Sequence, residues 1–484
     1  MHSSSSEHRS QHPGPFQAAE VEGTECASDG QLDTPHAGWG RKLFRQVALL
    51  SGSASVSHLL LLACSPILAR IYDREDFATF GFYQSALAIF SLILTMQYEQ
   101  AIPLPKSEHD ARLLRKLSLR RSALLAIAAV CLQLICQSAG ILPDIWLSPW
   151  VMLALPFCSL GEAWARTYRL DAIRSARFSS LSLSRMSLSV ATIFGQILLW
   201  MGGLGGLGLV LGDGLARWVS IWPLWNRNDR VNSKGNSDSD QSDVRRLAHE
   251  YSRFPWLLTP AAVLALLINM VPAFVLPVMY GEIFAGEFAL ANRSVLLPML
   301  LISQAVTQVY VSEAARMVRD RQEHLPSFIL RTVLQMGGIG ILMAAVAAAT
   351  GPRLFPVLFG AKWTGAGLIV PLLAISGFAQ FVGGPVNQVL VPLRQESRKL
   401  WMHFVGACLI VVIFCGCAWT EASPMTAVTC YALSVLAIQT LYVWQSLRLA
   451  QQAVCQWKSE RSAVGAVSTS EQSEGGLRTL VPAA

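Results

Sequence analysis

The sequence predicts an all-α protein that crosses a membrane many times. Of its 484 residues, 52% are hydrophobic and only 14% are charged, whereas soluble proteins carry about 25% charged residues. The mean hydropathy of +0.42 agrees with this deficit of charge. Apolar runs such as 47–68 and 256–280 also exceed the roughly 20 residues that a helix needs to cross the hydrocarbon core. A water-soluble enzyme is therefore not expected.

About twelve membrane-spanning helices are expected, six in each half of the chain. The predicted spans are 47–69, 77–98, 122–142, 149–170, 186–203, 205–225, 255–280, 288–311, 328–350, 366–391, 401–420 and 425–446. Only the glycine-rich run 202–206 separates the fifth span from the sixth, so the two could instead form one kinked element. Residues 354–363 are predicted to lie along the membrane surface rather than to cross it.

Polar segments divide the spans into domains. Residues 1–42 are rich in Ser, His and Gly and are predicted to be a disordered tail rather than a signal peptide, because the first apolar run is too long. The stretch 226–241 is hydrophilic and is typical of a linker. The predicted organisation is a tail over 1–42, a first lobe over 43–225, a linker over 226–250, a second lobe over 251–447 and a tail over 448–484.

Basic residues collect in alternate loops, and this sets the predicted orientation. One side of the membrane holds 31 Lys and Arg residues and the other holds four, which are Arg70, Arg74, Arg353 and Lys362. Cytoplasmic loops are the ones enriched in basic residues, so both termini and the linker are expected in the cytoplasm. The net charge of +7 then comes from these loops, and no nucleic-acid partner is expected.

The two halves show a faint internal repeat. Both enter the membrane in the same direction, as parallel repeats do, because six is an even number of spans. Residues 76–78 (DFA) and 287–289 (EFA) stand 211 positions apart, and so do Gln97 and Gln308. We therefore expect the lobes to derive from a duplication.

Motifs for cofactors or metals are missing from the sequence. Eight of the ten cysteines lie inside apolar runs, where Cys behaves as a small hydrophobic residue. There is no C-x-x-C pair and no Walker-type G-x-x-x-x-G-K-[ST] motif. We therefore expect no cofactor, no metal and no ATP-driven pump within this chain.

Three stretches carry a resemblance to a known family. They are 68–105, 251–315 and 358–386, and their family-like residues include Arg70, Tyr72, Asp76, Phe77, Glu99, Phe288, Arg293, Pro298, Gly360 and Trp363. Over roughly residues 45–405 the chain resembles the bacterial polysaccharide-biosynthesis, or oligosaccharide flippase, family. That family belongs to the multidrug, oligosaccharidyl-lipid and polysaccharide (MOP) exporter superfamily, which also contains the MATE transporters.

The resemblance implies a fold, a cargo and a location. It implies two six-helix lobes around a central cavity, in the bacterial inner membrane. The cargo would be a polyprenyl-pyrophosphate-linked oligosaccharide, moved by alternating access, with other polysaccharide-assembly proteins as further partners. Coupling to Na⁺ or H⁺ stays open.

Two other functions are alternatives to this one. A drug/cation antiporter of the same superfamily would favour acidic residues in the cavity over arginines. An integral-membrane polysaccharide polymerase or ligase would need a large outer loop with paired Arg or carboxylate residues, whereas the predicted outer loops are short. The protein is therefore expected to be a transporter and not an enzyme.

Charged residues within the spans are the candidates for the site, because each costs at least about 2.5–3.5 kcal/mol at mid-membrane. Arg293 lies inside the eighth span, and Gln304 and Gln308 follow on roughly the same helix face. Its guanidinium could bind a phosphate through two parallel hydrogen bonds. The alternative is that Arg293 lies near the outer end of its span and reaches the interface.

Two pairs of opposite charge are further candidates for the cavity wall. Asp213 and Arg217 in the sixth span stand four residues apart, as do Glu162 and Arg166 in the fourth. This spacing allows pairing along a helix, and an internal pair of this kind is more often structural.

Three uncharged or terminal positions complete the set of candidates. Gln97 and Glu99 close the second span and could gate the cavity, although a carboxylate that caps a helix end is the plainer interpretation. Asn269 in the seventh span could line the cavity or hydrogen-bond across helices.

Overall fold

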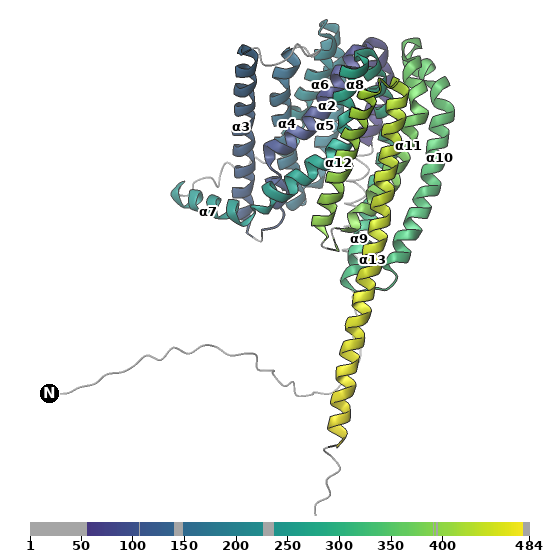
Figure 1. Ribbon diagram of the computed structural model, residues 1–484. Helices are drawn as coiled ribbons and strands as arrows, with labels where there is room; N and C mark the ends of the chain where they lie inside the picture. The colour runs from purple at the N-terminus through teal and green to yellow at the C-terminus, as the bar shows by residue number, and fades with distance from the viewer. Residues whose placement is uncertain are drawn as a thin grey trace, which may run out of the picture. The chain divides into compact units, whose positions relative to one another are not determined.

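The structure is a computed structural model in which long helices dominate. It describes residues 56–105, 107–139, 149–225, 237–390, 392–393 and 395–477. Side chains are described in these ranges except at 237–242, 308, 396, 461 and 463–477. All regular elements in these ranges are helical (Figure 1). This follows from the apolar runs, because a helix satisfies its own backbone hydrogen bonds in lipid. The predicted tail over 1–42 lies outside the described residues, and the described residues belong to one compact unit.

The first lobe begins with a helix described over 56–71. It continues with α2 (Arg74–Thr95), η1 (Tyr98–Ala101), α3 (Glu108–Ser138), α4 (Pro149–Arg174), α5 (Phe178–Met201), α6 (Gly205–Val219) and η2 (Trp222–Leu224). Gly203 and Gly205 take φ values of +74° and +48° between α5 and α6, a conformation that favours glycine. The glycine-rich run is therefore a break between two helices and not a kink in one.

The second half of the predicted linker forms a helix, α7 (Ser237–Glu250). Val244, Leu247, Ala248 and Tyr251 recur at the spacing of one helix face. Leu247 is buried in a small cluster with Tyr98 and residues of α3. The linker is thus anchored to the first lobe by the apolar face of α7.

The second lobe contains six longer helices. They are α8 (Thr259–Tyr280), α9 (Glu282–Arg319), α10 (Leu325–Phe359), α11 (Thr364–Asn387), α12 (Glu396–Trp419) and α13 (Pro424–Leu477). The π-helical turn η4 (Phe254–Leu258) precedes α8, and the short η5 (Ala361–Trp363) and η6 (Gln388–Leu390) lie on either side of α11. Gly281, with φ +84°, forms the sharp turn from α8 to α9. In the described part of the chain, every predicted span of both lobes coincides with a helix.

Within the described residues, nine helices are long and apolar enough to cross a membrane. The other three predicted spans fall on the helix over 56–71, on the 15-residue α6 and on α4. The first two are short, whereas α4 carries Glu162, Arg166 and Arg169 near its middle. Charged residues inside a predicted span are candidates for a functional site, because each is costly in the membrane.

The prediction that residues 354–363 lie along the membrane surface was wrong. Leu354–Phe359 continues α10, and Phe355 and Phe359 are buried. Trp363 has no exposed surface, packs edge-on against Phe77 and donates its Nε1 hydrogen to the Ala69 carbonyl oxygen at 2.7 Å. The aromatic residues that suggested a membrane interface instead pack inside the protein.

The two lobes repeat one pattern of helix contacts. In the first lobe α4 contacts α2, α3 and α6, and in the second lobe α11 contacts α9, α10 and α13. The repeat seen in residues 76–78 and 287–289 likewise lies at the start of α2 and near the start of α9. This pattern agrees with the expected duplication.

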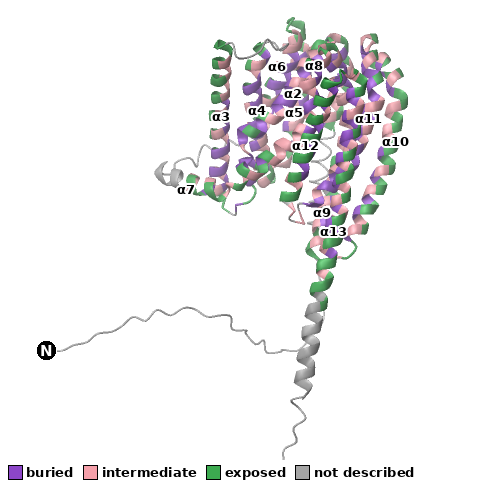
Figure 2. Ribbon diagram, viewed as in Figure 1, coloured by how far each residue is buried: buried purple, intermediate pink, exposed green. Residues whose placement is uncertain are grey.

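Burial separates central helices from peripheral ones. The apolar windows of α2 and α11 are 56% and 61% buried, whereas those of α3 and α10 are 11% and 17% buried. Figure 2 shows the same contrast between buried and exposed residues. Contacts between the lobes run mainly from α2 to α8 and α9, so α2 is the element that places the lobes against each other.

Candidate functional site

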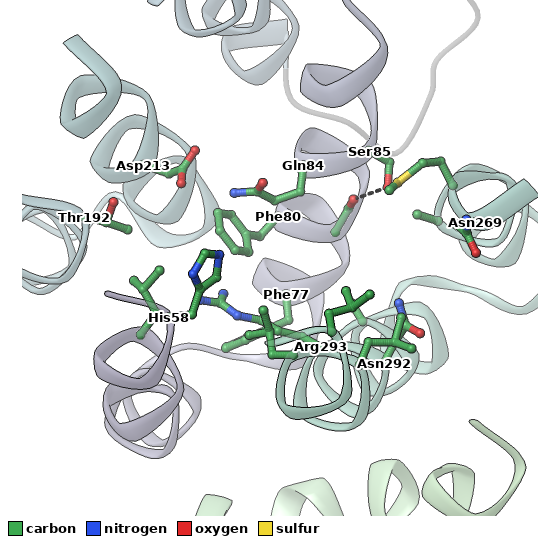
Figure 3. A pocket seen from close by; sticks show the side chains of 18 of the residues that line it. His58, Phe77, Phe80, Gln84, Ser85, Thr192, Asp213, Asn269, Asn292 and Arg293 are labelled. Atoms are coloured by element: carbon green, nitrogen blue, oxygen red, sulfur yellow. Dashed lines mark hydrogen bonds between the residues drawn. The ribbon is translucent and has the colours of Figure 1, made fainter. Parts of the chain in front are cut away.

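A cavity of about 750 Å³ lies between the two lobes (Figure 3). Its wall is made by the helix over 56–71, by α2, α4, α5 and α6 of the first lobe, and by α8, α9 and α11 of the second. Typical small-molecule pockets span about 300–1,000 Å³, so this one can hold a sizeable polar group.

The first-lobe wall of the cavity is a connected set of ion pairs centred on Glu162. Its carboxylate accepts hydrogen bonds from Arg169 at 2.6 Å and from Arg217. Arg217 in turn donates its Nε hydrogen to Asp213 at 2.8 Å, and Asp213 accepts a further hydrogen bond from the Tyr83 hydroxyl at 3.0 Å. Removing one member of such a buried pair leaves an uncompensated charge, which is strongly unfavourable.

The cavity as a whole carries more positive than negative charge. Its charged lining residues are Glu162, Arg169, Arg185, Asp213, Arg217 and Arg293, a formal net charge of +2. In a low-dielectric wall this excess attracts an anion much more strongly than it would in water. Within the described residues, no group of three or more His, Cys, Asp or Glu residues could hold a metal ion.

Arg293 supplies the positive charge of the second-lobe wall. It lines the cavity, and its guanidinium carbon lies 5.6 Å from the centre of the Phe80 ring. Figure 3 shows it close to His58 and Phe77. Among the described residues no carboxylate lies within salt-bridge distance of it. Arg217, in contrast, already holds two carboxylates, so Arg293 is the arginine that is better placed to bind an anion.

Amide side chains make up most of the remaining polar surface on the second-lobe wall. Asn269 of α8, Asn292 and Gln304 of α9 and Gln380 of α11 all line the cavity. The Oδ1 atoms of Asn269 and Asn292 and the Nε2 atom of Gln380 are buried and lack a hydrogen-bond partner within the described residues. Such buried, unpartnered polar atoms are rare in native structures.

The predicted site residues fall into two groups. The structure places Arg293, Gln304, Arg217, Asp213, Glu162 and Asn269 on the cavity wall. Gln308 lies in α9, but its side chain is not among those described. Gln97, Glu99 and Arg166 are not lining residues.

The second group connects to the cavity through Arg166. Its guanidinium lies 3.9 Å from the carboxylates of both Glu162 and Glu99. Glu99 has no exposed surface, and Gln97 precedes it with a left-handed φ of +55°. These residues therefore join the ionic wall of the cavity to the end of α2.

Sequence reasoning missed several lining residues. Asn292, Gln380, Arg169 and Arg185 were not proposed as parts of the cavity wall. For Asn292, Gln380 and Arg169 the available signal was a polar side chain inside an apolar span. Arg185 lies one residue before the predicted fifth span, 186–203, and gave no such signal. Asn292 also stands directly before Arg293 in α9, and both residues line the cavity.

One end of the cavity is closed by direct contacts between the lobes. Arg74 of α2 pairs with Glu287 of α9 at 3.2 Å. Lys362 pairs with Asp73 at 3.0 Å, and Arg70 donates a hydrogen bond to the Val357 carbonyl oxygen at 3.1 Å. Three of the four basic residues on the side that is poor in Lys and Arg are thus used to join the lobes.

Comparison with known proteins gives both a family and a fold. Residues 67–367 match the family described as "Polysaccharide biosynthesis protein". A sequence search among curated proteins finds no match.

Solved structures with similar folds are membrane transporters and a flippase. The lipid II flippase MurJ in an inward closed conformation aligns with a TM-score of 0.60 at 11% identity, over 83% of this chain and 87% of MurJ. A mutant of the Vibrio cholerae MATE transporter VcmN aligns with a TM-score of 0.54 at 14% identity, over 86% of this chain and 98% of VcmN. The eukaryotic MATE transporter AtDTX14 aligns with a TM-score of 0.52 at 12% identity, over 86% of this chain and 100% of AtDTX14.

These matches confirm the family resemblance and the all-helical, multi-pass, MATE-like fold that the sequence predicts. The family match covers more than half of the chain, and nine described helices meet the requirements of a membrane span. The chain is a multi-pass membrane protein that belongs to the polysaccharide biosynthesis protein family and has the fold of the MATE transporters and MurJ.

Proposed function

We propose that this protein is a flippase that carries a polyprenyl-pyrophosphate-linked oligosaccharide across the bacterial inner membrane for polysaccharide biosynthesis. The observation that carries the proposal is the net positive cavity between the lobes, with Arg293 held without a carboxylate partner among the described residues. Membership of the polysaccharide biosynthesis family supports the carbohydrate part of the cargo. The fold shared with a lipid II flippase supports its lipid part.

The cargo makes a physical demand that this cavity meets. A diphosphate and several sugars cannot cross the hydrocarbon core unaided, because polar groups there lack hydrogen-bond partners. Arginine can bind a phosphate through two parallel hydrogen bonds and keeps its charge in an apolar setting. In the proposed complex, Arg293 holds the diphosphate inside the cavity while the polyprenyl tail stays in the lipid.

The proposed transport cycle uses the contacts at the closed end of the cavity. The excess of basic residues in alternate loops supports a cytoplasmic location for both termini, so the end closed by Arg74 and Glu287 would face outward. The lobes would then bind cargo from the inside and separate at this end to release it. Outward movement of a diphosphate with about two negative charges releases about 2.3 kcal/mol per charge for each 100 mV of inside-negative potential.

A drug/cation antiporter of the same superfamily is the main alternative. Such a transporter would need a cavity that attracts cations. Both carboxylates of this cavity, Glu162 and Asp213, are already bound to arginines, and four arginines outnumber them. The charge of the cavity therefore favours an anionic cargo. Coupling to Na⁺ or H⁺ is compatible with either function.

Deletion of the gene tests the proposed function in cells. The mutant should accumulate complete lipid-linked oligosaccharide in the cytoplasmic leaflet, measured by protection of the sugars from an added periplasmic glycosidase. Truncated or unlinked sugars in the deletion strain would instead indicate an enzyme.

Purified protein in liposomes provides the direct measurement. Lipid-linked oligosaccharide extracted from the deletion strain should become accessible on the far leaflet only when the protein is present. Liposomes in which the protein moves a cationic dye but never the glycolipid would overturn the proposal and support the antiporter.

A further inference from the structure

His58 is a cavity residue that the proposed function does not use. It lies in the helix over 56–71 of the first lobe, is half-buried and lines the cavity. Among the described lining residues it is the one histidine. Histidine changes its charge between about pH 5 and pH 8, so His58 can alter the charge of the cavity wall near neutral pH.

Hydrogen bonds to α5 fix the backbone beside His58 to the first lobe. The Ser189 hydroxyl donates a hydrogen bond to the carbonyl oxygen of Ser57 at 3.1 Å. The Ser57 hydroxyl donates in turn to the Sδ atom of Met186 at 3.4 Å, and Ser57 is buried. The residue directly before His58 is therefore held against α5, while the His58 side chain reaches the cavity.

Arg293 approaches the same part of the cavity from the second lobe. Its neighbours Ala291 and Val295 are buried in the core, which fixes this part of α9. Like His58, Arg293 is half-buried and lines the cavity, and Figure 3 shows the two side chains close together. Two groups that can both be cationic repel each other in an empty site, and both attract an anion that lies between them.

The other charged groups of the cavity wall come from three helices of the first lobe. They are Glu162 and Arg169 of α4, Arg185 of α5, and Asp213 and Arg217 of α6, whereas the lining residues of α2, α8 and α11 are uncharged. Both carboxylates already form ion pairs with arginines. Protonation of His58 would therefore increase the positive charge that an anion meets in the cavity.

We propose that His58, in its protonated form, binds the diphosphate of the cargo together with Arg293. This inference rests on the proposed function and adds a residue of the first lobe to the cargo site. A protonated imidazole donates from both ring nitrogens, and hydrogen bonds from a charged donor to phosphate are among the strong ones. The bound diphosphate would contact both lobes at once, and one proton would bind with it wherever His58 is neutral in the empty protein.

The pH dependence of cargo binding tests this proposal. Purified full-length protein in nanodiscs is titrated at about pH 6 and about pH 8 with lipid-linked oligosaccharide extracted from the gene-deletion strain. The diphosphate of this lipid is esterified at both ends, so its charge does not change between the two conditions. We expect the wild type to bind about tenfold more tightly at the lower pH, because histidine loses its proton within this interval.

Two variants of His58 separate its charge from its packing. His58→Gln cannot be protonated, so it should bind at both pH values as weakly as the wild type does at the higher one. His58→Arg carries a permanent charge, so it should bind tightly at both. Elution volume and thermal unfolding midpoint establish that each variant is folded.

His403→Gln is the matched control. His403 is also a histidine in a membrane-spanning helix, but it is buried in α12, shares a hydrogen bond with Tyr442 and does not line the cavity. This variant should keep both the affinity and the pH dependence of the wild type.

The outcomes separate the role of His58 from the proposed function. The role of His58 would be overturned by wild-type binding that does not change with pH, or by a pH dependence that persists in His58→Gln or His58→Arg. Equal loss of binding by His58→Gln at both pH values would indicate a structural role and would overturn it as well. Each of these results leaves the flippase in place. Failure of the wild-type protein to bind the lipid at either pH would overturn the proposed function itself.

Discussion

The guanidinium of Arg74 lies 3.2 Å from the carboxylate of Glu287 and ties α2 of the first lobe to α9 of the second. The backbones of α2 and α9 also come into close contact here, because a Cβ atom on Gly286 would collide with the Arg74 carbonyl oxygen. Glu287 also reaches across to the start of α11, where a Cβ on Gly365 would meet its carboxylate. The lobes are therefore held together at this end by an ion pair and by a close backbone contact.

Removing the charge of Arg74 should make this end of the protein open more often. The two side chains are 34% and 11% exposed, so we expect Arg74→Gln to cost the closed state about 1 kcal/mol, or about a fivefold change in the ratio of closed to open molecules. Spin labels at the exposed positions Met201 and Val278, in a variant without other cysteines, report the distance between the lobes at this end.

The exchanged pair Arg74→Glu with Glu287→Arg is the control for this prediction. If the attraction between the two charges holds the lobes, the double variant should recover most of the closed population that either single change loses. Distances that are unchanged in Arg74→Gln would show that the ion pair does not contribute.

Gly286→Ala should open the same end more strongly than the loss of the ion pair. The new methyl group would collide with a backbone oxygen of α2, and a backbone atom cannot turn aside as a side chain can. Overpacking of this kind typically costs about 1–3 kcal/mol. Gly337→Ala in α10 is the control, because a Cβ there meets nothing within 4 Å. It should leave the distance between the labels unchanged, and an unchanged distance in Gly286→Ala would contradict the prediction.

The ionic wall of the cavity should be required for stability. Arg217→Leu leaves Glu162 and Asp213 without their shared partner, and removal of one member of a buried ion pair costs about 3–5 kcal/mol. A large drop in the thermal unfolding midpoint of the purified protein is expected. The double variant Asp213→Asn with Arg217→Gln should be less destabilised, because it removes both charges of one pair while Glu162 keeps its hydrogen bond from Arg169.

Arg316→Gln is the comparison for the stability measurement. Arg316 pairs with Glu313 at an exposed position, where an ion pair is worth about 0–1 kcal/mol. Its unfolding midpoint should stay close to that of the wild type. A midpoint for Arg217→Leu that is equally close would show that the buried network does not stabilise the fold.

The positions of the helices could be predicted from the sequence because they depend on local properties. Length and hydropathy of a run decide whether it can cross the membrane, and in the described part of the chain helices coincide with all twelve predicted spans. The local sequence pattern also indicates the helix α7, because its apolar residues recur on one face. The polar composition of this segment had favoured a linker instead. The prediction for residues 354–363 failed, because packing against another helix and location at the membrane surface both favour aromatic residues.

The site was predictable only as far as its contacts are local. Asp213 and Arg217 lie one helical turn apart, so their pairing follows from spacing. Glu162 binds the same arginine from another helix, 55 residues away, and no pattern in the sequence indicates this contact. The amides at Asn292 and Gln380 are ordinary polar residues in apolar helices until packing places them around one cavity.

Arg293→Ala should abolish polysaccharide export without lowering the amount of protein in the membrane. The arginine lies against Phe80 and forms no ion pair with a described carboxylate. Its loss therefore leaves no described carboxylate without its partner and should leave the fold intact. Arg293→Lys keeps the charge but loses the two parallel hydrogen bonds to a phosphate, and we expect partial export. Surface polysaccharide in a complemented deletion strain measures export, and immunoblotting of membranes measures abundance. Normal export by Arg293→Ala would remove this residue from the cargo site and would leave Arg169, Arg185 and Arg217 as the other cavity arginines to test.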